Sequence, residues 1–279
     1  MNALELINVK KSFPGFELGE LTLSLPSGCI MGLIGENGAG KTTTIKLILD
    51  ILHADAGEIR VLGRDSRECG RLTKEEVGVV PDEIGLPDCM TVRQIGRMMR
   101  STYSNWNESE YTRLIKKLEL PENKCFKEFS RGMKMKLGIA VAMSHGSKLL
   151  LLDEPTSGLD PVARDEVVEL FYDFTRDEEH SVLISSHIIS DLERLCDYVA
   201  FLHKGKLLLC EEKDRLLDEY CIVRCGHEDL TAFDAAIAKY KKETPYGVEL
   251  ILPRKDVPHG LTQGAVSIEE LFVVMAKEA

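Results

Sequence analysis

The chain has 279 residues, a net charge of −11 and 44% hydrophobic residues. This length has room for one large or two modest domains, and the composition argues against a disordered, collagen-like or coiled-coil protein. The 46 acidic and 35 basic residues argue against nucleic acid as the main partner, because phosphate binding needs a local excess of Lys and Arg.

No apolar run approaches the roughly 20 residues that cross a bilayer, and the most apolar segment is only 149–152. The first residues lack the basic and then apolar regions of a secretory signal. We therefore expect a soluble, cytosolic chain with reduced, scattered cysteines. Cys221 and Cys225 leave a metal site open as an alternative, although no second cysteine pair completes a ligand set.

The first part of the chain predicts short strands and one helix. Apolar runs, alternating or continuous, predict strands over residues 4–9, 21–25, 29–34, 58–62 and 77–80. The apolar spacing from 42 to 52 predicts a helix directly after the third of these strands.

The middle of the chain changes character. From Thr91 to about Ser147 the apolar spacing is helical, with stripes over 114–120 and 137–143, which predicts a helical insertion in an α/β domain. Strands and helices then alternate, which predicts a largely parallel sheet. The expected strands are 149–152, 182–185, 198–203 and 206–210, and the expected helices are 161–175 and 189–196.

A small appendix is expected after about Tyr220. Strands are predicted at 221–225 and 248–252, and a capping box of Ser267 and Glu270 begins a last helix. Between the strands, four apolar residues fall on one predicted helical face: Leu230, Phe233, Ile237 and Tyr240.

Residues 35–43, Gly-Glu-Asn-Gly-Ala-Gly-Lys-Thr-Thr, fit the phosphate-loop pattern G-x-x-x-x-G-K-[ST] between a predicted strand and a predicted helix. Backbone N–H groups of such a loop and the positive end of the helix attract phosphate. Lys41 would place its charge on the β and γ phosphates, and the Thr42 hydroxyl can ligate Mg²⁺. We therefore expect a nucleoside triphosphate to be held by Asn37, Gly38, Ala39, Gly40, Lys41, Thr42 and Thr43.

Two adjacent acids, Asp153 and Glu154, follow the predicted buried strand 149–152. At the carboxyl end of a parallel strand they would lie in the crevice where such sheets bind ligands. Asp153 can hold Mg²⁺ directly or through water, and Glu154 is placed to polarise an attacking water as a general base.

With these motifs, residues 4 to about 210 resemble the ATP-binding subunits of ABC transporters. Residues 157–160, Ser-Gly-Leu-Asp, are similar to the family's D-loop, and 185–187, Ser-Ser-His, to its switch histidine. Residues 129–133, Phe-Ser-Arg-Gly-Met, precede the acidic pair where the family keeps its LSGGQ signature.

The resemblance implies an α/β fold of the P-loop NTPase type. It has a mainly parallel sheet, an antiparallel β subdomain, a helical insertion at about 84–147 and a small α+β C-terminal appendix. The implied boundaries are 1–215 for the ATP-binding domain and 216–279 for the appendix.

The resemblance also implies that two subunits pack head to tail around two ATP molecules. Five residues of each subunit would then help to complete the ATP site of its partner. They are Ser130, Arg131, Gly132, Met133 and Asp160. Ser130 and Gly132 would reach the partner's γ-phosphate, and the start of a helix at Ser130 also favours an anion there. Asp160 would cross the interface, although beside Pro161 it could equally cap a helix.

Two further roles follow from the resemblance. His187 would contact the γ-phosphate and help to hold the attacking water. Phe13 would stack on adenine, with Phe16 as the alternative.

Two departures from the family pattern stand out. Asp82 occupies the place of the Q-loop glutamine, so the expected metal ligands are Thr42, Asp82 and Asp153. The signature is altered at three positions, and Arg131 adds a positive charge near the presumed phosphate position. We expect hydrolysis to survive, because Glu154, His187 and two residues of the signature remain.

The resemblance thus implies an ATPase that uses ATP and Mg²⁺ as a homodimer, or as a heterodimer with a related subunit. A separate permease would dock near Asp82 to Met99 and hold the chain at the inner face of the cell membrane. No direct nucleic acid binding is expected.

The phosphate loop's beginning, Gly-Leu-Ile-Gly-Glu-Asn-Gly at 32–38, and the appendix resemble bacterial exporters of drugs, peptide antibiotics or lipids. An importer subunit stays open as an alternative, and a soluble, non-transport ABC ATPase is the third reading. The short interval between the phosphate loop and the acidic pair has no sustained heptads, which argues against the chromosome-associated type.

Overall fold

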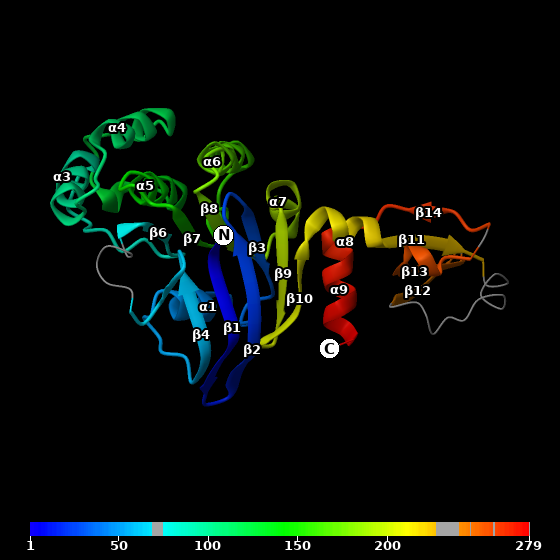
Figure 1. Ribbon diagram of the computed structural model, residues 1–279. Coiled ribbons are helices and arrows are strands. Elements are labelled where there is room, and N and C mark those ends of the chain that lie inside the picture. The colour runs from blue at the N-terminus through cyan, green and yellow to red at the C-terminus, as the bar shows by residue number, and fades with distance from the viewer. Residues whose placement is uncertain (69–74, 227–239, 246, 259, 279) are drawn as a thin grey trace.

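Strand β3 (Ile30–Ile34), which leads into the phosphate loop, lies inside a six-stranded sheet of order β10-β9-β3-β8-β7-β6. The computed structural model describes residues 1–279 except 69–74, 227–239, 246, 259 and 279 (Figure 1). The other strands of this sheet are β6 (Val77–Val80), β7 (Leu149–Asp153), β8 (Ser181–Ser186), β9 (Tyr198–His203) and β10 (Lys206–Glu212).

All neighbouring strands of this sheet run parallel except β9 and β10, which pair antiparallel at one edge. Every residue of β3, β7 and β8 is buried, as in parallel strands that are covered on both faces. The predicted, mainly parallel sheet is thus confirmed. Its carboxyl ends bring the loops after β3, β7 and β8 to the same edge.

A second sheet is antiparallel throughout, with the order β2-β1-β4-β5. Its strands are β1 (Asn2–Phe13), β2 (Phe16–Pro26), β4 (Ala56–Val61) and β5 (Arg64–Asp65). Their inward-facing residues share a buried core with β3 and with helix α1 (Lys41–Ile48). This sheet is the predicted antiparallel β subdomain.

Helix α1 ends at Ile48, so the predicted helix over 42–52 is wrong in its last four positions. Asp50 adopts a left-handed backbone with a φ of 54°, which ends the helical path. Leu49 and Leu52 still pack against the core, and this packing of the turn explains why their spacing resembled a helix.

The predicted helical insertion forms a separate group of helices beside the edge of the parallel sheet (Figure 1). A capping box of Thr91 and Gln94 begins the first of them, and all of them share one buried cluster with β6 and β7. The elements are α3 (Val92–Thr102), α4 (Glu108–Lys117), the 3₁₀ turn η1 (Phe126–Glu128) and α5 (Arg131–Met143).

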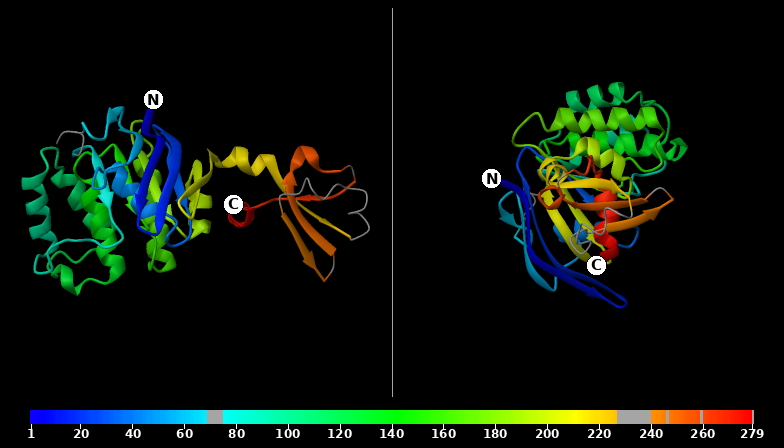
Figure 2. Two further views of the ribbon diagram at one scale, coloured as in Figure 1. Left: turned by 90° about the horizontal axis from the view of Figure 1, so that it is seen from below. Right: turned by 90° about the vertical axis from the view of Figure 1, so that its right-hand side faces the viewer.

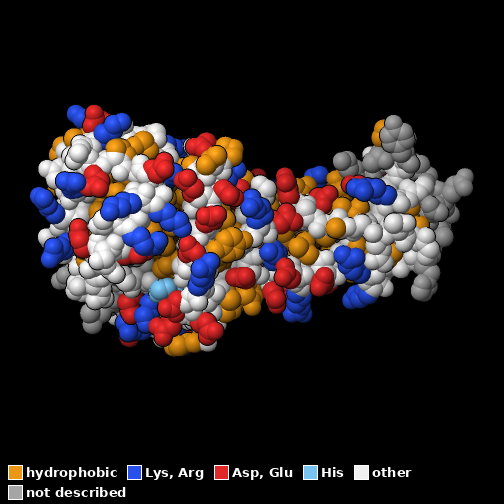
Figure 3. Space-filling view, turned by 90° about the horizontal axis from the view of Figure 1, so that it is seen from above, with side chains coloured by type: hydrophobic (Ala, Val, Ile, Leu, Met, Phe, Trp, Pro, Cys, Tyr) orange, Lys and Arg blue, Asp and Glu red, His pale blue; other side chains and the backbone are white. Residues whose placement is uncertain are grey.

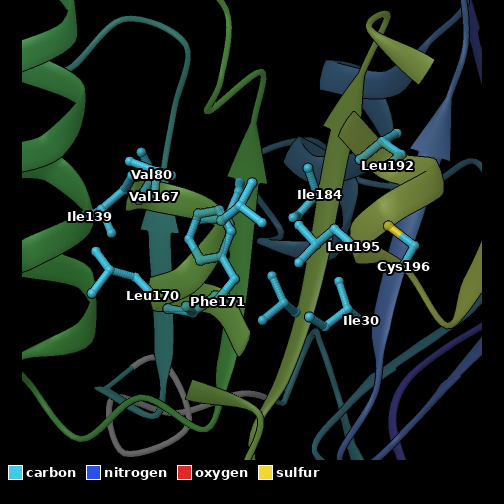
Figure 4. Packing of buried hydrophobic residues seen from close by; sticks show 14 of the residues in the cluster. Ile30, Val80, Ile139, Val167, Leu170, Phe171, Ile184, Leu192, Leu195 and Cys196 are labelled. Atoms are coloured by element: carbon cyan, nitrogen blue, oxygen red, sulfur yellow. The ribbon is translucent and has the colours of Figure 1, made fainter. Parts of the chain in front are cut away.

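Helices α6 (Pro161–Phe174) and α7 (Ile189–Leu195) follow β7 and β8 and pack on the parallel sheet. Figure 4 shows Phe171 of α6 in the middle of this core, between Val80 on one side and Ile184 on the other. Cys196, directly after α7, is fully buried here, and burial raises the pKa of its thiol.

The C-terminal part begins with helix α8 (Lys213–Glu219), which was not predicted and buries only Leu216. A third, antiparallel sheet of order β12-β13-β11-β14 follows. Figures 1 and 2 agree that this sheet lies beyond α8, at the opposite end of the molecule from the helical insertion. Its elements are β11 (Tyr220–Cys225), β12 (Tyr240–Thr244), β13 (Gly247–Pro253), the 3₁₀ turn η4 (Arg254–Asp256) and β14 (Gln263–Gly264).

The predicted strands 221–225 and 248–252 are confirmed as β11 and β13. Tyr240 was expected on a helical face, but it begins β12 and pairs with Ile251 of β13. Pairing with a neighbouring strand thus overrides the local apolar spacing at this position. The other members of that expected face, Leu230, Phe233 and Ile237, lie outside the described residues.

The last helix, α9 (Ile268–Glu278), returns to the core around the parallel sheet. Phe272 meets Phe201 of β9 edge to face, with ring centroids 5.4 Å apart. The backbone N–H of Ile268 donates to Glu193 Oε1 of α7 at 3.3 Å. At the other end of α9, Lys277 Nζ lies 5.2 Å from the Tyr240 ring centroid. Helix α9 therefore ties the third sheet to the main core.

None of the helices that the structure describes combines the length and the apolarity that a membrane crossing needs.

Replacing Phe272 by Ala should lower the free energy of unfolding by about 3 kcal/mol, because a buried aromatic ring is lost and leaves a cavity. Val273→Ala is the matched control, since this neighbour is 39% exposed and should change stability by less than about 0.5 kcal/mol. Chemical denaturation measures both. Equal effects would show that α9 does not stabilise the body through Phe272.

Candidate active site

The phosphate loop joins β3 to α1, and its tip at Asn37 and Gly38 is exposed while Ala39 and Gly40 are buried. Gly40 has a φ of 112°, and a Cβ there would lie 2.7 Å from Leu18 Cδ1. Only glycine fits this position, because both the backbone conformation and the close approach exclude a side chain. The loop is therefore shaped before any phosphate arrives.

The Lys41 side chain folds back into this loop and is only 6% exposed. Its Nζ donates to the carbonyl oxygens of Gly35 at 2.7 Å and Glu36 at 3.2 Å. The same ammonium lies 3.2 Å from Glu154 Oε1. A buried cation needs such partners, and phosphate oxygens could replace them.

Thr42 and Asp153 form a second contact between the two motifs. Thr42 Oγ1 donates to Asp153 Oδ2 at 2.7 Å, and Ser185 Oγ donates to Asp153 Oδ1 at 2.5 Å. Asp153 pairs with Ser185 in the parallel register of β7 and β8, which explains why these side chains meet. A hydroxyl and one carboxylate, completed by phosphate oxygens, suit Mg²⁺.

Glu154 lies between the phosphate loop and the end of β8. Its backbone N–H donates to the Ser185 carbonyl oxygen and to Ser185 Oγ, both at 3.1 Å. Its φ of 53° is rare for a non-glycine residue. The side chain is 13% exposed, and Oε2 lies 2.7 Å from His187 Nδ1. The strained backbone thus aims the carboxylate at both Lys41 and His187.

The structure therefore gathers at one edge of the sheet the predicted residues Lys41, Thr42, Asp153, Glu154 and His187. Sequence reasoning gave Ser185 no role of its own, although it contacts both acids. The sequence signal that could have indicated this role was the position of Ser185 near the end of the strand that precedes His187.

Asp82 makes its contact elsewhere. Its Oδ1 accepts a hydrogen bond from Arg131 Nη2 at 2.6 Å. Asp82 as a metal ligand stays a prediction. Across the described ranges, no group of three or more His, Cys, Asp or Glu side chains is placed to hold a metal ion. The metal site at Cys221 and Cys225 stays an open alternative, because residues 227–239 beside it lie outside the described residues.

Ser130 caps helix α5, since its Oγ accepts a hydrogen bond from the Met133 backbone N–H at 3.2 Å. Ser130 and Arg131 are exposed, and Gly132 and Met133 are half-buried. Asp160 caps α6, because its Oδ1 accepts from the N–H groups of Val162 and Ala163 at 3.1 Å each. These backbone donors, Ala163 above all, hold the pKa of Asp160 below its usual range.

Phe13 and Phe16 lie at the two ends of the β1–β2 turn, with ring centroids 6.4 Å apart. A Cβ on Gly40 would be 3.2 Å from Phe16 Cζ, so Phe16 packs against the phosphate loop. Both rings are half-buried. A hollow beside the loop is lined by Gly15, Phe16, Glu17, Gly19, Gly38, Lys204 and Lys206.

A phosphate loop before a helix, with an acid pair at the carboxyl end of a parallel strand of the same sheet, defines a P-loop nucleoside triphosphatase. Comparison with known families narrows this class. The ABC transporter family model matches residues 18–157.

Among curated proteins, the chain is 33% identical over 226 residues to the ABC transporter ATP-binding protein YtrB of Bacillus subtilis (strain 168), covering 81% of this chain and 77% of that protein. It is 35% identical over 214 residues to the lantibiotic transport ATP-binding protein SrtF of Streptococcus pyogenes, covering 76% and 91%. A solved ATP-binding subunit of an ABC transporter superposes with a TM-score of 0.68 at 28% identity, covering 77% and 91%. The chain belongs to the ABC transporter family, as an ATP-binding subunit of the ABC ATPase type.

Replacing Ser185 by Ala should weaken ATP binding about 10-fold, because a hydrogen bond to a carboxylate contributes about 1.5–3 kcal/mol. Asp153 would lose the donor that fixes it beside Thr42. Ser181→Ala is the matched control, since Ser181 is fully buried at the other end of the same strand. It should lose stability but keep ATP affinity, and calorimetric titration measures the ATP affinity of both variants. Equal losses of ATP affinity in the two variants would show that Ser185 has no specific role in the site.

Proposed function

We propose that this ATP-binding subunit hydrolyses ATP in a head-to-tail dimer and drives export through a separate membrane subunit. The observation that carries the proposal is the joint placement of Lys41, Glu154 and His187. One carboxylate, 13% exposed, lies 3.2 Å from an ammonium and 2.7 Å from an imidazole.

Hydrolysis would begin when the triphosphate takes over the contacts of Lys41. The ammonium would then bind the β and γ phosphates, and Glu154 would lose its cation partner. The freed carboxylate accepts a proton from the attacking water, while His187 holds the γ-phosphate and that water in place. Mg²⁺, bound by Thr42 and Asp153, would neutralise charge on the phosphate oxygens.

The second half of each site would come from the partner subunit. Ser130 caps the start of the 13-residue helix α5, whose free N–H groups and positive end suit a γ-phosphate. Ser130, Gly132 and Met133 would face the partner's ATP, and Asp160 would approach the interface. A homodimer is the simplest arrangement, because each of two identical chains would then complete the other's site.

A permease would dock on the segment from Asp82 to Met99. The residues from 81 to 90 are exposed or half-buried. Asp82 and Glu83 are among the residues that line a hollow of about 430 Å³. Figure 3 shows Lys and Arg side chains interspersed with Asp and Glu over the helical end of the molecule. This docking would hold the subunit at the inner face of the membrane.

Export of a peptide antibiotic, drug or lipid is the transport that we propose. The similarity to SrtF, whose name states lantibiotic transport, supports it. We further propose an ATP-binding domain over 1–215, with a helical insertion at about 84–147, and an appendix over 216–279. The appendix would support the body through α9.

Glu154→Gln tests the proposal directly. With its permease in vesicles, the variant should lose at least about 100-fold in the rate of ATP hydrolysis, because the general base is removed. It should still bind ATP, and transport should fall with hydrolysis. Glu169→Gln, an exposed position on α6, is the control and should keep both rates. Equal hydrolysis by the wild type and Glu154→Gln would reject Glu154 as the base, and an inactive wild type would reject the proposed function.

The roles of Phe13 and Phe16 can be distinguished by comparing the binding of two ligands. Phe13→Ala should weaken ATP binding about 10-fold, since a base stacked on an aromatic ring contributes about 1–3 kcal/mol. It should leave binding of inorganic tripolyphosphate, which has no base, unchanged. Phe16→Ala should weaken the binding of both ATP and tripolyphosphate, because Phe16 packs against Gly40 of the loop. The reverse pattern would assign adenine stacking to Phe16. Calorimetric titration gives all four affinities.

A further inference from the structure

The two departures of this chain from the family pattern contact each other. Asp82, in the Q-loop position, accepts a hydrogen bond from Arg131, in the signature, at 2.6 Å. We propose that Asp82 is a positioning residue that acts through Arg131 to fix the start of α5 for ATP hydrolysis. This inference rests on the proposed function of the signature in the dimer.

The first argument is electrostatic. Arg131 is the first residue of α5, and the first turn of this helix has no acidic residue. A cation is unfavourable at the positive end of a helix, whereas an anion is favourable. The carboxylate of Asp82 neutralises Arg131 and also supplies the missing negative charge. Asp82 thereby compensates for the arginine in the signature.

The second argument is the position of the pair. Asp82 follows β6, and Gly158 follows β7, its parallel neighbour in the sheet. A Cβ on Gly158 would lie 3.3 Å from Arg131 Cδ, so the arginine stem packs on the D-loop while its guanidinium reaches the Q-loop. Arg131 therefore connects two loops of the nucleotide-binding body to the helical insertion.

The residues around Arg131 are already fixed by packing. Phe129 is 6% exposed and lies beside Phe126, with ring centroids 6.3 Å apart. A Cβ on Gly132 would lie 3.1 Å from Leu159 Cδ2, and Leu159 is 6% exposed. Ser130 and Arg131 are the exposed residues between these anchors. The Asp82 contact orients the guanidinium group, while the aliphatic part of the arginine packs on the D-loop.

The expected size of the effect is modest. The side chains of Arg131 and Asp82 are 56% and 48% exposed, and exposed ion pairs shift equilibria by about five-fold or less. Loss of the pair should therefore slow hydrolysis about 3- to 5-fold without abolishing it.

A double-mutant cycle tests the pair in the full chain with its permease. The variants are Asp82→Asn, Arg131→Gln and both together, with Asp82→Glu as the conservative replacement. Asp82→Asn should lower kcat about 3- to 5-fold and leave the KM for ATP and the Mg²⁺ concentration for half-maximal rate unchanged. The double variant should be no slower than Arg131→Gln alone, and Asp82→Glu should restore most of the rate.

A second readout does not depend on hydrolysis. Hydrogen exchange of the Met133 and Lys134 amides, which bond to Ser130, should quicken about 3- to 5-fold in Asp82→Asn without nucleotide. It should not quicken further in the double variant. This readout tests the pair even if the wild type proves inactive, which would reject only the proposed function.

Glu122→Gln is the matched control. Glu122 pairs with Arg93 at 2.6 Å on the same helical insertion, with comparable exposure. It should change neither kcat nor exchange at Met133. Additive effects of the two single variants would overturn the inference, and so would a raised Mg²⁺ requirement of Asp82→Asn that persists without Arg131, because Asp82 would then act on the metal.

Discussion

The buried ammonium of Lys41 is the constraint on which the site depends. Its side chain is 6% exposed and is held by two loop carbonyls and by the Glu154 carboxylate. A charge cannot stay buried without such partners, so the loop, the lysine and the acid must be positioned together. Parallel pairing of β3, β7 and β8 achieves this, because it places the ends of all three strands at one edge.

The same constraint explains the strained backbone of Glu154. A left-handed residue costs of order 1–2 kcal/mol, and here it points one carboxylate at both a cation and an imidazole. Ser185 supports the arrangement by bonding to Asp153 and to the Glu154 backbone. A site held this firmly before ATP binds needs little reorganisation when the phosphates displace the lysine contacts.

Away from this edge, packing positions the remaining segments that we propose to be functional. Helix α5 begins within the segment that we propose as the signature, and the contact between Asp82 and Arg131 joins it to the loop after β6. At the other end, α9 returns to the body through Phe272 and Phe201. The third sheet is therefore connected to the main core by α8 at its start and by α9 at its end.

The amino-acid sequence was enough to predict the class of fold and most of the residues that meet at the edge of the sheet. The phosphate loop, the acid pair and the strand–helix alternation are local patterns, and they predicted the parallel sheet and the residues that meet at its edge. Local patterns failed where a neighbouring strand or a turn decided the backbone, as at Tyr240 and after Ile48. The structure was needed to show that Ser185 bridges the two acids, that Asp82 and Arg131 pair, and that α9 packs on β9. These contacts join residues far apart in the chain, and a sequence pattern contains no information about which distant side chains meet.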